Sequence, residues 1–470
     1  MAHVGLVGIG VMGGALALNL SEKGHDVSMM DRGMDKMEAV HAEARDTNLS
    51  GALQAFLDPA AFVASIPAPR AIFVLVPSGG PLDSVIETLR PHLDKGDVIA
   101  DLGNSNWENT ERRLKALEGT GLLFLGIGIS GGEDGARNGA SLMAGGSRDS
   151  WSMVEGPLKD IAAKFEDEPC CDWFGPGGSG HFIKMLHNGI EYADMQLIAE
   201  AYGLMRDGLG MEATDIGDVF ASWMDGPLNS YLIEIAAEVC HAEDPETGHA
   251  MVDMIHDAAG QKGTGRWSVI EALHLGAATS MMVAAVEARN ISADWEKRQE
   301  VQSRFGSGAG KLDVDIEAFL EDLRQAMLAA KIGAYVQGFQ VLARASEAFD
   351  WDLDLAAIAR VWRAGCIIRS VMLDDISDVF SADNNADLAL APAFASKLED
   401  GKDALRKTVV AGFNANHPMP SFGAALNFFN LRRTGRGTAN MIQGLRDRFG
   451  AHSFERTDRR GEKVNGPWHD

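Results

Sequence analysis

The chain has 470 residues, of which 46% are hydrophobic and 23% charged, which is long enough for two or three domains with well-buried cores. Its formal net charge of -25 argues against a diffuse electrostatic attraction to nucleic acid or anionic lipid, so an anionic substrate would need a local basic pocket. Four cysteines without a CxxC pair indicate neither a disulfide framework nor a cysteine-bound metal, and without a leader-like start or a membrane-length apolar run we predict a cytoplasmic protein.

The first 178 residues alternate short apolar runs with helical patterns. The apolar runs lie at 3–8, 26–31, 71–77, 97–103 and 122–130. Strands that are separated by helices indicate right-handed crossovers and a mostly parallel sheet. We therefore predict an α/β Rossmann-type domain over residues 1–178.

A glycine-rich turn follows the first apolar run. In GIGVMGG, Gly8, Gly10 and Gly13 match the spacing G-x-G-x-x-G, and a helical pattern continues after them. Glycines at these positions allow a tight turn and a close approach of the backbone to a pyrophosphate, which the free N–H groups of the helix N-terminus then bind. The pattern predicts dinucleotide binding, and the alternative is a plain tight turn.

The end of the second apolar run bears on the choice of cofactor. An acidic residue there accepts hydrogen bonds from the ribose of NAD, whereas a nearby arginine accommodates the 2′-phosphate of NADP. Here Asp31 and Arg32 occur together. These two residues leave both cofactors open, and Arg32 alone could equally be a solvated side chain.

A second glycine-rich segment, GISGGEDGARNG at 128–139, follows what we take to be the last strand of the sheet. Ligands of α/β sheets bind at the carboxyl ends of the strands. Ser130, Gly131 and Gly132 can therefore present a hydroxyl and backbone N–H groups to a carboxylate. The alternative is a glycine-rich loop without chemical function.

The rest of the chain has a different character. GPGGSG at 175–180 is the most glycine-dense break and the natural linker, and helical periodicity dominates from there to about residue 430. We predict a large all-α domain over 179–430. The last segment, 431–470, is basic and glycine-rich, and it has too few apolar residues for a core of its own. We expect it to be a tail that packs on something else.

Five polar residues share one side of the helix predicted at 181–196, HFIKMLHNGIEYADMQ. At about 100° per residue they fall in one sector, opposite Phe182 and its apolar neighbours, and they are Lys184, His187, Asn188, Glu191 and Tyr192. One interpretation is a solvated face with local polar pairs. The other is an acid/base site.

Further cationic residues are candidates for binding an anion. AGQKGTGRW at 259–267 places Lys262, Thr264 and Arg266 around two glycines, without the glycine spacing of a Walker motif. Arg289, Arg446 and His452 are further candidates. Each of them alone could be an ordinary surface charge.

Taken together, five motifs in this order resemble the 6-phosphogluconate dehydrogenases: GVMGGALALNL, SGGEDGARNGASLM, KMLHNGIEY, GQKGTGRW and RDRFGAHSF. The resemblance extends over the whole chain. It implies a Rossmann domain, a helical domain, and a homodimer in which the tail of each subunit reaches into its neighbour. It also implies oxidation and decarboxylation of 6-phosphogluconate to ribulose 5-phosphate and CO2, with NADP or NAD as the oxidant and no metal.

The resemblance also implies a role for each matching residue. Lys184 corresponds to the general base and Glu191 to the general acid. The residues that would hold the substrate are Asn104, Ser130, Gly131, Gly132, His187, Asn188, Tyr192, Lys262, Thr264, Arg289 and, from the partner subunit, Arg446 and His452. The cofactor would contact Gly8, Gly10, Val11, Met12, Gly13, Asp31, Arg32, Val76 and Asn104.

The chain departs from the family at the cofactor. Asp31-Arg32-Gly33 replaces the usual Asn-Arg-Thr or Asn-Arg-Ser, and Pro77 stands where the family has a lysine. We therefore expect appreciable use of NAD beside NADP. A related β-hydroxyacid dehydrogenase is the nearest alternative, but it would lack GQKGTGRW and the tail. A non-catalytic nucleotide-binding protein of the same fold would have no reason to keep Lys184, Glu191 and the anion-binding residues together.

Overall fold

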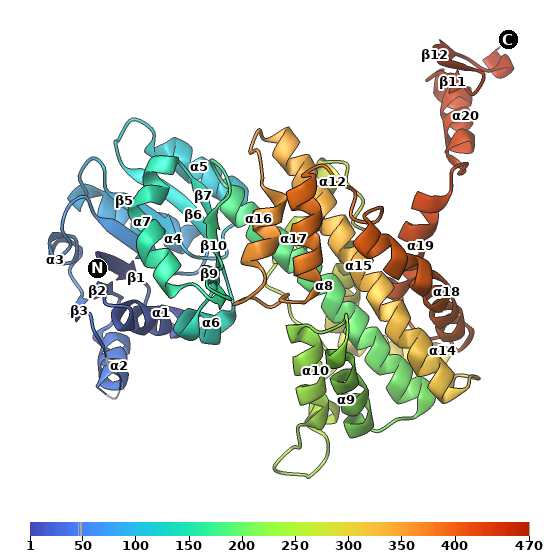
Figure 1. Ribbon diagram of the computed structural model, residues 1–470, viewed down its shortest axis with the longest axis horizontal. Coiled ribbons are helices and arrows are strands. Elements are labelled where there is room, and N and C mark those ends of the chain that lie inside the picture. The colour runs from blue at the N-terminus through green and yellow to red at the C-terminus, as the bar shows by residue number, and fades with distance from the viewer. Residues whose placement is uncertain (46, 48, 470) are drawn as a thin grey trace.

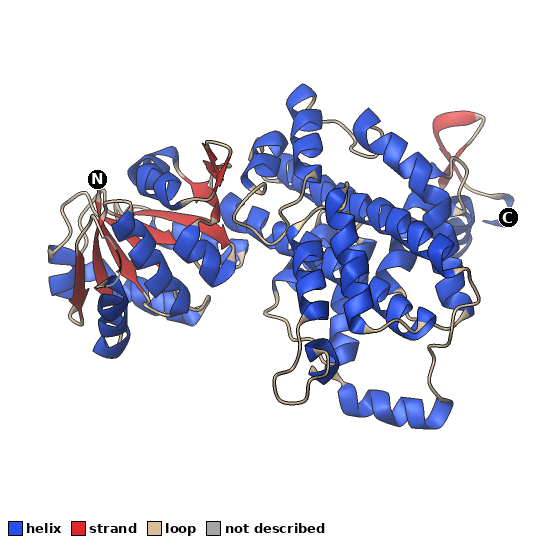
Figure 2. Ribbon diagram, turned by 60° about the horizontal axis from the view of Figure 1, so that its bottom comes forward, coloured by secondary structure: helices blue, strands red, loops and turns tan. Residues whose placement is uncertain are grey.

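The structure is a computed structural model that describes residues 1–45, 47 and 49–469. It consists of a sheet covered by helices, a larger helical body, and a C-terminal segment that stands away from both (Figures 1 and 2). This arrangement is the α/β Rossmann domain, all-α domain and tail that the sequence predicts. No helix within the described residues is long and apolar enough to cross a bilayer.

The main sheet has eight strands in the order β10-β7-β6-β5-β4-β1-β2-β3. Neighbouring strands are parallel except for β6 and β7, which pair antiparallel. The strands are β1 (His3–Val7), β2 (Asp26–Met30), β3 (Leu53–Phe56), β4 (Ala71–Val74), β5 (Val98–Asp101), β6 (Leu123–Ser130), β7 (Ser141–Gly146) and β10 (Cys171–Trp173). The order reverses between β1 and β4, which is where ligands of such sheets bind.

The five apolar runs of the sequence correspond to β1, β2, β4, β5 and β6. One expectation was wrong, because β6 is not the last strand. After Ser130 the chain makes a short helix and returns as β7, antiparallel to β6. The sequence of β7 ends in Ala144, Gly145 and Gly146, so its apolar signal is weak. Ser130 nevertheless lies at the carboxyl end of β6, the same edge at which β1, β4 and β5 end.

Helices cover both faces of this sheet (Figure 2). Two apolar clusters, one on each face, form its core. A two-stranded ribbon of β8 (Lys164–Phe165) and β9 (Glu168–Pro169) leads into β10. The helices are α1 (Val11–Glu22), α2 (Met34–Ala44), α3 (Pro59–Ala64), α4 (Gly80–Leu89), α5 (Trp107–Leu117), α6 (Gly132–Asn138) and α7 (Arg148–Ile161).

The helical body is built around two long helices and a single apolar core. α8 (Ser179–Gly203) connects the two parts of the molecule, because it packs on β6 and β7 as well as on α12, α13 and α15. The other helices are α9 (Ala213–Ser222), α10 (Tyr231–His241), α11 (Met251–Met254), α12 (Thr264–His274), α13 (Ser280–Ala293), α14 (Trp295–Phe305), α15 (Ile316–Ala348), α16 (Leu355–Val361), α17 (Met372–Ala382), α18 (Pro392–Asn414) and α19 (Pro420–Arg433).

Both sides of the N-terminal half of α8 are buried. Phe182 and Leu186 are 0% exposed, but on the polar side Lys184 is only 6% and His187 0% exposed. Glycine in β6 makes this possible, since a Cβ atom at Gly128 would lie 2.2 Å from Cβ of Lys184. The polar stripe is therefore not a solvated face, and the interpretation as an acid/base site remains.

The C-terminal segment, which we call the tail, folds around a carboxylate. It contains α20 (Ala439–Gly450), β11 (Phe454–Arg456) and β12 (Arg459–Val464). Asp447 is 0% exposed and accepts hydrogen bonds from the backbone N–H groups of Ser453 and Gly466 and from Nε1 of Trp468. Figure 1 shows the tail projecting from the end of α19.

We propose that the first domain comprises 1–178, the second 179–430 and the tail 431–470, whose last residue, Asp470, lies outside the described residues. α8 begins at Ser179, which supports the first boundary. α19 continues to Arg433, so the tail proper leaves the body a few residues after the second boundary.

Candidate active site

The turn between β1 and α1 has the geometry of a pyrophosphate site. Gly8 has a φ of +95°, and a Cβ atom there would lie 2.4 Å from the carbonyl oxygen of Leu75. A Cβ atom at Gly13 would lie 2.0 Å from the carbonyl oxygen of Gly8. Gly10 is the N-cap of α1, has no side-chain cap, and has open space at its Cβ position. The free N–H groups of this helix end therefore fit a phosphate.

The neighbouring residues predicted to contact the cofactor border this turn. Val11 is 67% exposed and Met12 is half-buried in the first turn of α1. Val76 is half-buried just beyond β4, and Asn104 is exposed beyond β5. These positions lie beyond the carboxyl ends of β1, β4 and β5, which is the edge at which sheets of this kind bind their ligands.

Asp31 contacts the glycine-rich turn itself. Its Oδ2 accepts a hydrogen bond of 2.7 Å from the N–H of Ile9, and its Oδ1 accepts one of 2.7 Å from the N–H of Arg32. Nζ of Lys36 lies 3.6 Å from Oδ1, and the side chain of Arg32 is exposed. The sequence interpretation missed Lys36, a second cation beside Asp31; its place in the first turn of the helix after β2 was the available signal.

Lys184 lies at the centre of a buried polar cluster. Its Nζ donates a hydrogen bond of 2.9 Å to Oγ of Ser130 and lies 3.3 Å from Nδ1 of His187. Oγ of Ser130 is also 3.3 Å from Nε2 of His187. Burial lowers the pKa of Lys184 from its usual 10.5, because desolvation disfavours the ammonium. The lowered pKa increases the fraction of Lys184 that is a neutral amine, which is the form that a general base needs.

His187 is held as a neutral ring. Burial, and then the charge of Lys184, lower its pKa well below the usual 6.5. Its ring meets that of Trp362 edge-on at 5.6 Å, and its Nδ1 lies 3.2 Å from Oδ1 of Asn188. A neutral imidazole beside Lys184 avoids a second buried cation and can still exchange hydrogen bonds. The sequence interpretation missed Trp362, because only the tertiary fold brings it to α8.

Glu191 lies on the same side of α8, and its side chain is 17% exposed. Burial raises its pKa above the usual 4.5, although the charges of Lys184 and Arg289 oppose this. One carboxylate oxygen lies 3.8 Å from Nδ1 of His187. A carboxyl group whose pKa is raised retains its proton more readily and suits a general acid.

The remaining stripe residues meet α12 and α13. Nδ2 of Asn188 donates a hydrogen bond of 2.9 Å to Oγ1 of Thr264, which begins α12 directly after Gly263 with its φ of +98°. The guanidinium of Arg289 lies 3.6 Å from the ring centroid of Tyr192. The structure therefore brings these four side chains, separated by up to about a hundred residues, to one wall.

Four of the cations considered from the sequence are not gathered at this wall in the single chain. Lys262 and Arg266 are exposed at the start of α12. Arg446 and His452 are exposed in the tail, and Figure 1 shows α20 well away from the N-terminal half of α8. Gly131, with a φ of +109°, and Gly132 lie directly beside Ser130 at the start of α6.

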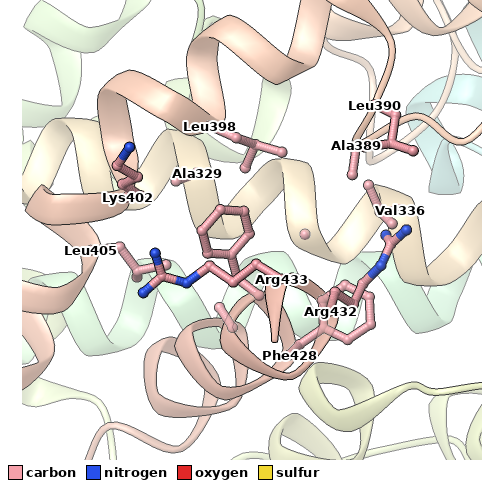
Figure 3. A pocket seen from close by; sticks show the side chains of 13 residues that line it. Ala329, Val336, Ala389, Leu390, Leu398, Lys402, Leu405, Phe428, Arg432 and Arg433 are labelled. Atoms are coloured by element: carbon pink, nitrogen blue, oxygen red, sulfur yellow. The ribbon is translucent and has the colours of Figure 1, made fainter. Parts of the chain in front are cut away.

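An apolar cavity lies elsewhere in the helical body. It lies between α15, α18 and α19, where Leu398, Leu405 and Phe428 face Arg432 and Arg433 (Figure 3). None of the predicted site residues lines it. Within the described residues, no group of three or more His, Cys, Asp or Glu side chains is arranged to hold a metal ion.

The glycine-rich turn lies at the same sheet edge as Ser130, which accepts a hydrogen bond from the buried Lys184 of α8, and this is the arrangement expected of a nicotinamide-dependent dehydrogenase. Comparison with known families makes this specific. Residues 3–175 match the NAD binding domain of 6-phosphogluconate dehydrogenase, and residues 180–468 match the C-terminal domain of 6-phosphogluconate dehydrogenase. The chain belongs to the 6-phosphogluconate dehydrogenase family.

Individual relatives agree over the full length. The chain is 45% identical to a decarboxylating 6-phosphogluconate dehydrogenase of Synechococcus elongatus over 98% of both chains. It is 43% identical to an NAD(+)-dependent, decarboxylating one of Bacillus subtilis over 97% of both. A solved structure of Plasmodium falciparum 6-phosphogluconate dehydrogenase, described with NADP+ and with 6-phosphogluconate, superimposes with a TM-score of 0.94 at 38% identity, covering 99% of this chain and 100% of that one.

Proposed function

We propose that the chain oxidises and decarboxylates 6-phosphogluconate to ribulose 5-phosphate and CO2, with reduction of NADP or NAD, as a step of the oxidative pentose phosphate pathway. The observation that carries the proposal is the buried Lys184, hydrogen-bonded to Ser130 at the sheet edge where the glycine-rich turn also lies. The whole-chain relatives support the choice of substrate.

Lys184 acts first as a general base. The nicotinamide cofactor, when bound, accepts the hydride from C3 of the sugar acid. Lys184 takes the proton of the C3 hydroxyl, for which its amine must be neutral. The resulting ammonium then donates a hydrogen bond to the new C3 carbonyl and stabilises the negative charge that develops there as CO2 leaves. The same cation serves as the electrophile of the decarboxylation step.

Glu191 completes the reaction by protonating C1 of the enediol. It lies two helical turns from Lys184 on the same side of α8, so it addresses a different carbon of the sugar. Ser130, with the backbone N–H groups of Gly131 and Gly132, holds the carboxylate that leaves. His187 and Asn188 bind hydroxyls.

The phosphate of the substrate requires cations, because the chain as a whole is acidic. We assign it to Tyr192, Lys262, Thr264 and Arg289 of one subunit. The tail of a second subunit supplies Arg446, with His452 beside it. The side chains of Lys262 and Arg446 are exposed, which is consistent with this role; Arg446 donates one hydrogen bond, of 3.3 Å, to Oε1 of Gln443.

A homodimer completes the site. The tail has an exposed apolar stripe on α20, where Met441, Ile442, Leu445 and Phe449 are between 56% and 75% exposed. Apolar residues also lie exposed near the anion-binding segment, including Ile255 at 57% and Ile291 at 63%. Such patches are typical of subunit contacts, and we infer that the tail of one subunit docks near α12 and α13 of the other.

We infer a cytoplasmic location from the cysteines. All four are buried free thiols. Desolvation raises the pKa of each of them, so they behave as inert core residues that need no oxidising compartment.

One assay tests the proposed function. Formation of reduced cofactor is followed with 6-phosphogluconate and either NADP or NAD, and CO2 release is measured in the same reaction. We expect equal amounts of reduced cofactor and CO2. Reduction without CO2 would favour a simple β-hydroxyacid dehydrogenase, and no reduction with either cofactor would reject the proposal.

The cofactor preference can be shifted at the end of β2. We expect dual use, because Asp31 can accept hydrogen bonds from the ribose hydroxyls of NAD while Arg32 and Lys36 can attract the 2′-phosphate of NADP. The double change Asp31→Asn and Gly33→Thr should move the ratio of kcat/KM values toward NADP by about ten- to a hundredfold, because one repulsion or polar contact is worth roughly 1–3 kcal/mol.

Gly33→Thr alone is the control, since it adds a hydroxyl without removing the carboxylate. A Cβ atom at Gly33 would lie 2.5 Å from Oδ1 of Asp35, and this side chain can move aside. An enzyme that already prefers NADP a thousandfold and is unmoved by the double change would show that Asp31 serves only the contacts to Ile9 and Arg32.

The acid/base pair predicts a bell-shaped dependence of kcat on pH. Lys184 works deprotonated, and its pKa is lowered from 10.5 by burial, so activity is lost as the pH falls through that pKa. Glu191 works protonated, and its pKa is raised from 4.5 by burial, so activity is lost as the pH rises through that pKa. The two shifts bring the pKa values of Lys184 and Glu191 closer together. A larger fraction of the enzyme then has Lys184 deprotonated and Glu191 protonated at the same time.

Glu191→Gln should lower kcat and remove the alkaline limb of the pH profile only. Retention of that limb would assign it to another group.

A further inference from the structure

A buried carboxylate that does not belong to the acid/base pair organises the turn that bears Asn104. Asp101 is the last residue of β5 and is 1% exposed. Its Oδ1 accepts a hydrogen bond of 2.9 Å from the N–H of Gly103, and its Oδ2 accepts one of 2.6 Å from the hydroxyl of Ser105. The two contacts bind the residues on either side of Asn104.

The contacts leave Asn104 as the projecting residue. Gly103 and Ser105 are buried, whereas Asn104 between them is exposed. The turn also rests on the end of β4, since a Cβ atom at Gly103 would lie 3.2 Å from the carbonyl oxygen of Val76. Its backbone is therefore fixed from two directions, which holds Asn104 beyond the carboxyl end of β5.

The same carboxylate faces the catalytic helix. Nε2 of His181 lies 3.9 Å from Oδ2 of Asp101, and its Nδ1 is 2.7 Å from Oγ1 of Thr110. His181 is buried and precedes Lys184 by one turn of α8. Burial lowers its pKa, so the ring is neutral. Its packing is tight, since a Cβ at Gly126 of β6 would lie 2.4 Å from the ring.

We propose that Asp101 is a positioning residue for hydride transfer: through its hydrogen bonds to Gly103 and Ser105 it fixes the turn that presents Asn104 to the nicotinamide and the sugar acid. The proposal rests on the proposed function, with Asn104 in the contact with substrate and cofactor that the family resemblance implies. It assigns Ser105 to this network, while His181 packs beside Asp101 without a hydrogen bond to it. A displacement of about 1 Å at a reacting centre can cost about a hundredfold in rate, so loss of one contact should be visible in the kinetics.

Ser105→Ala tests the network, because it removes one hydrogen bond to a carboxylate and leaves Asn104 in place. We expect kcat to fall about tenfold, with the affinity for the cofactor unchanged. The deuterium isotope effect, measured with substrate labelled at C3, should rise because hydride transfer becomes more rate-limiting. Ser105→Thr keeps the hydroxyl and should restore both values.

The matched control is Ser21→Ala. Ser21 is also 0% exposed, and its hydroxyl donates a hydrogen bond of 2.6 Å to the carbonyl oxygen of Gly51, but it lies at the far end of α1. The Ser21→Ala variant should lose about as much stability as Ser105→Ala, but its isotope effect should not change. Equal behaviour of Ser105→Ala and Ser21→Ala would overturn the proposal. If thermal denaturation shows Ser105→Ala to be unfolded, Ser105→Cys keeps the volume with a weaker donor and should show the same change.

A measurement without the sugar acid separates this proposal from the proposed function. The fluorescence of bound NADPH or NADH reports the surroundings of the nicotinamide. It should change in Ser105→Ala at unchanged cofactor affinity and return in Ser105→Thr. Failure of the unaltered enzyme to oxidise 6-phosphogluconate would reject the proposed function alone. Unchanged fluorescence in Ser105→Ala would reject the positioning role of Asp101.

Discussion

Lys184→Met is expected to abolish oxidation of the sugar acid, with a fall in kcat of about 10²–10⁴-fold. Methionine keeps the unbranched stem that packs against Gly128 but can neither accept the C3 proton nor donate to Ser130. The measurement is reduced-cofactor formation at saturating substrate, with cofactor affinity determined separately. That affinity should be unchanged, because Lys184 lies on α8 and not in the turn between β1 and α1.

Lys184→Arg is the companion variant. Arginine keeps a cation at this position but does not lose its proton in proteins. If positive charge alone drove the reaction, Lys184→Arg would be active while Lys184→Met was not. We expect both to be inactive, because the first step needs a neutral base. Near-normal rates in Lys184→Met would remove Lys184 from the mechanism.

Mixing two inactive variants is expected to restore activity if the tail completes the site of the other subunit. Arg446→Ala removes the anion-binding side chain of the tail, and Lys184→Met removes the base. In a mixed dimer one site carries both lesions and the other carries neither. Random exchange at equal concentrations should therefore recover about a quarter of the unaltered activity.

A pair of lesions on the same helix is the control. Lys184 and Glu191 both belong to α8, so mixed dimers of Lys184→Met and Glu191→Gln have one lesion in each site and should recover nothing. Subunit exchange is confirmed with differently tagged chains. If exchange occurs and the Arg446→Ala mixture stays inactive, Arg446 does not act in the neighbouring subunit.

The local features of the fold could be predicted from the sequence. The glycine-rich turn depends on three residues and on the strand and helix beside them. As the spacing indicates, a side chain would not fit at Gly8 or Gly13, and there is open space at Gly10. The strands of the main sheet that were missed, β3, β7 and β10, are short or rich in small residues, so their apolar signal is weak. The mistaken end of the sheet at β6 has this cause.

The sequence by itself determined two features through the types and spacing of its residues. They are the order of the strands along the chain and the polar stripe of α8. Only the tertiary structure decided that the stripe is buried, because Lys184 packs on Gly128 of β6 and His187 packs on Trp362, far away in the chain. The pKa directions of Lys184 and Glu191 follow from that burial and not from the residues themselves. The burial of Asp101 beside His181 likewise became visible only when β5 and α8 were placed together, since desolvation depends on distances in space, which spacing along a chain does not contain.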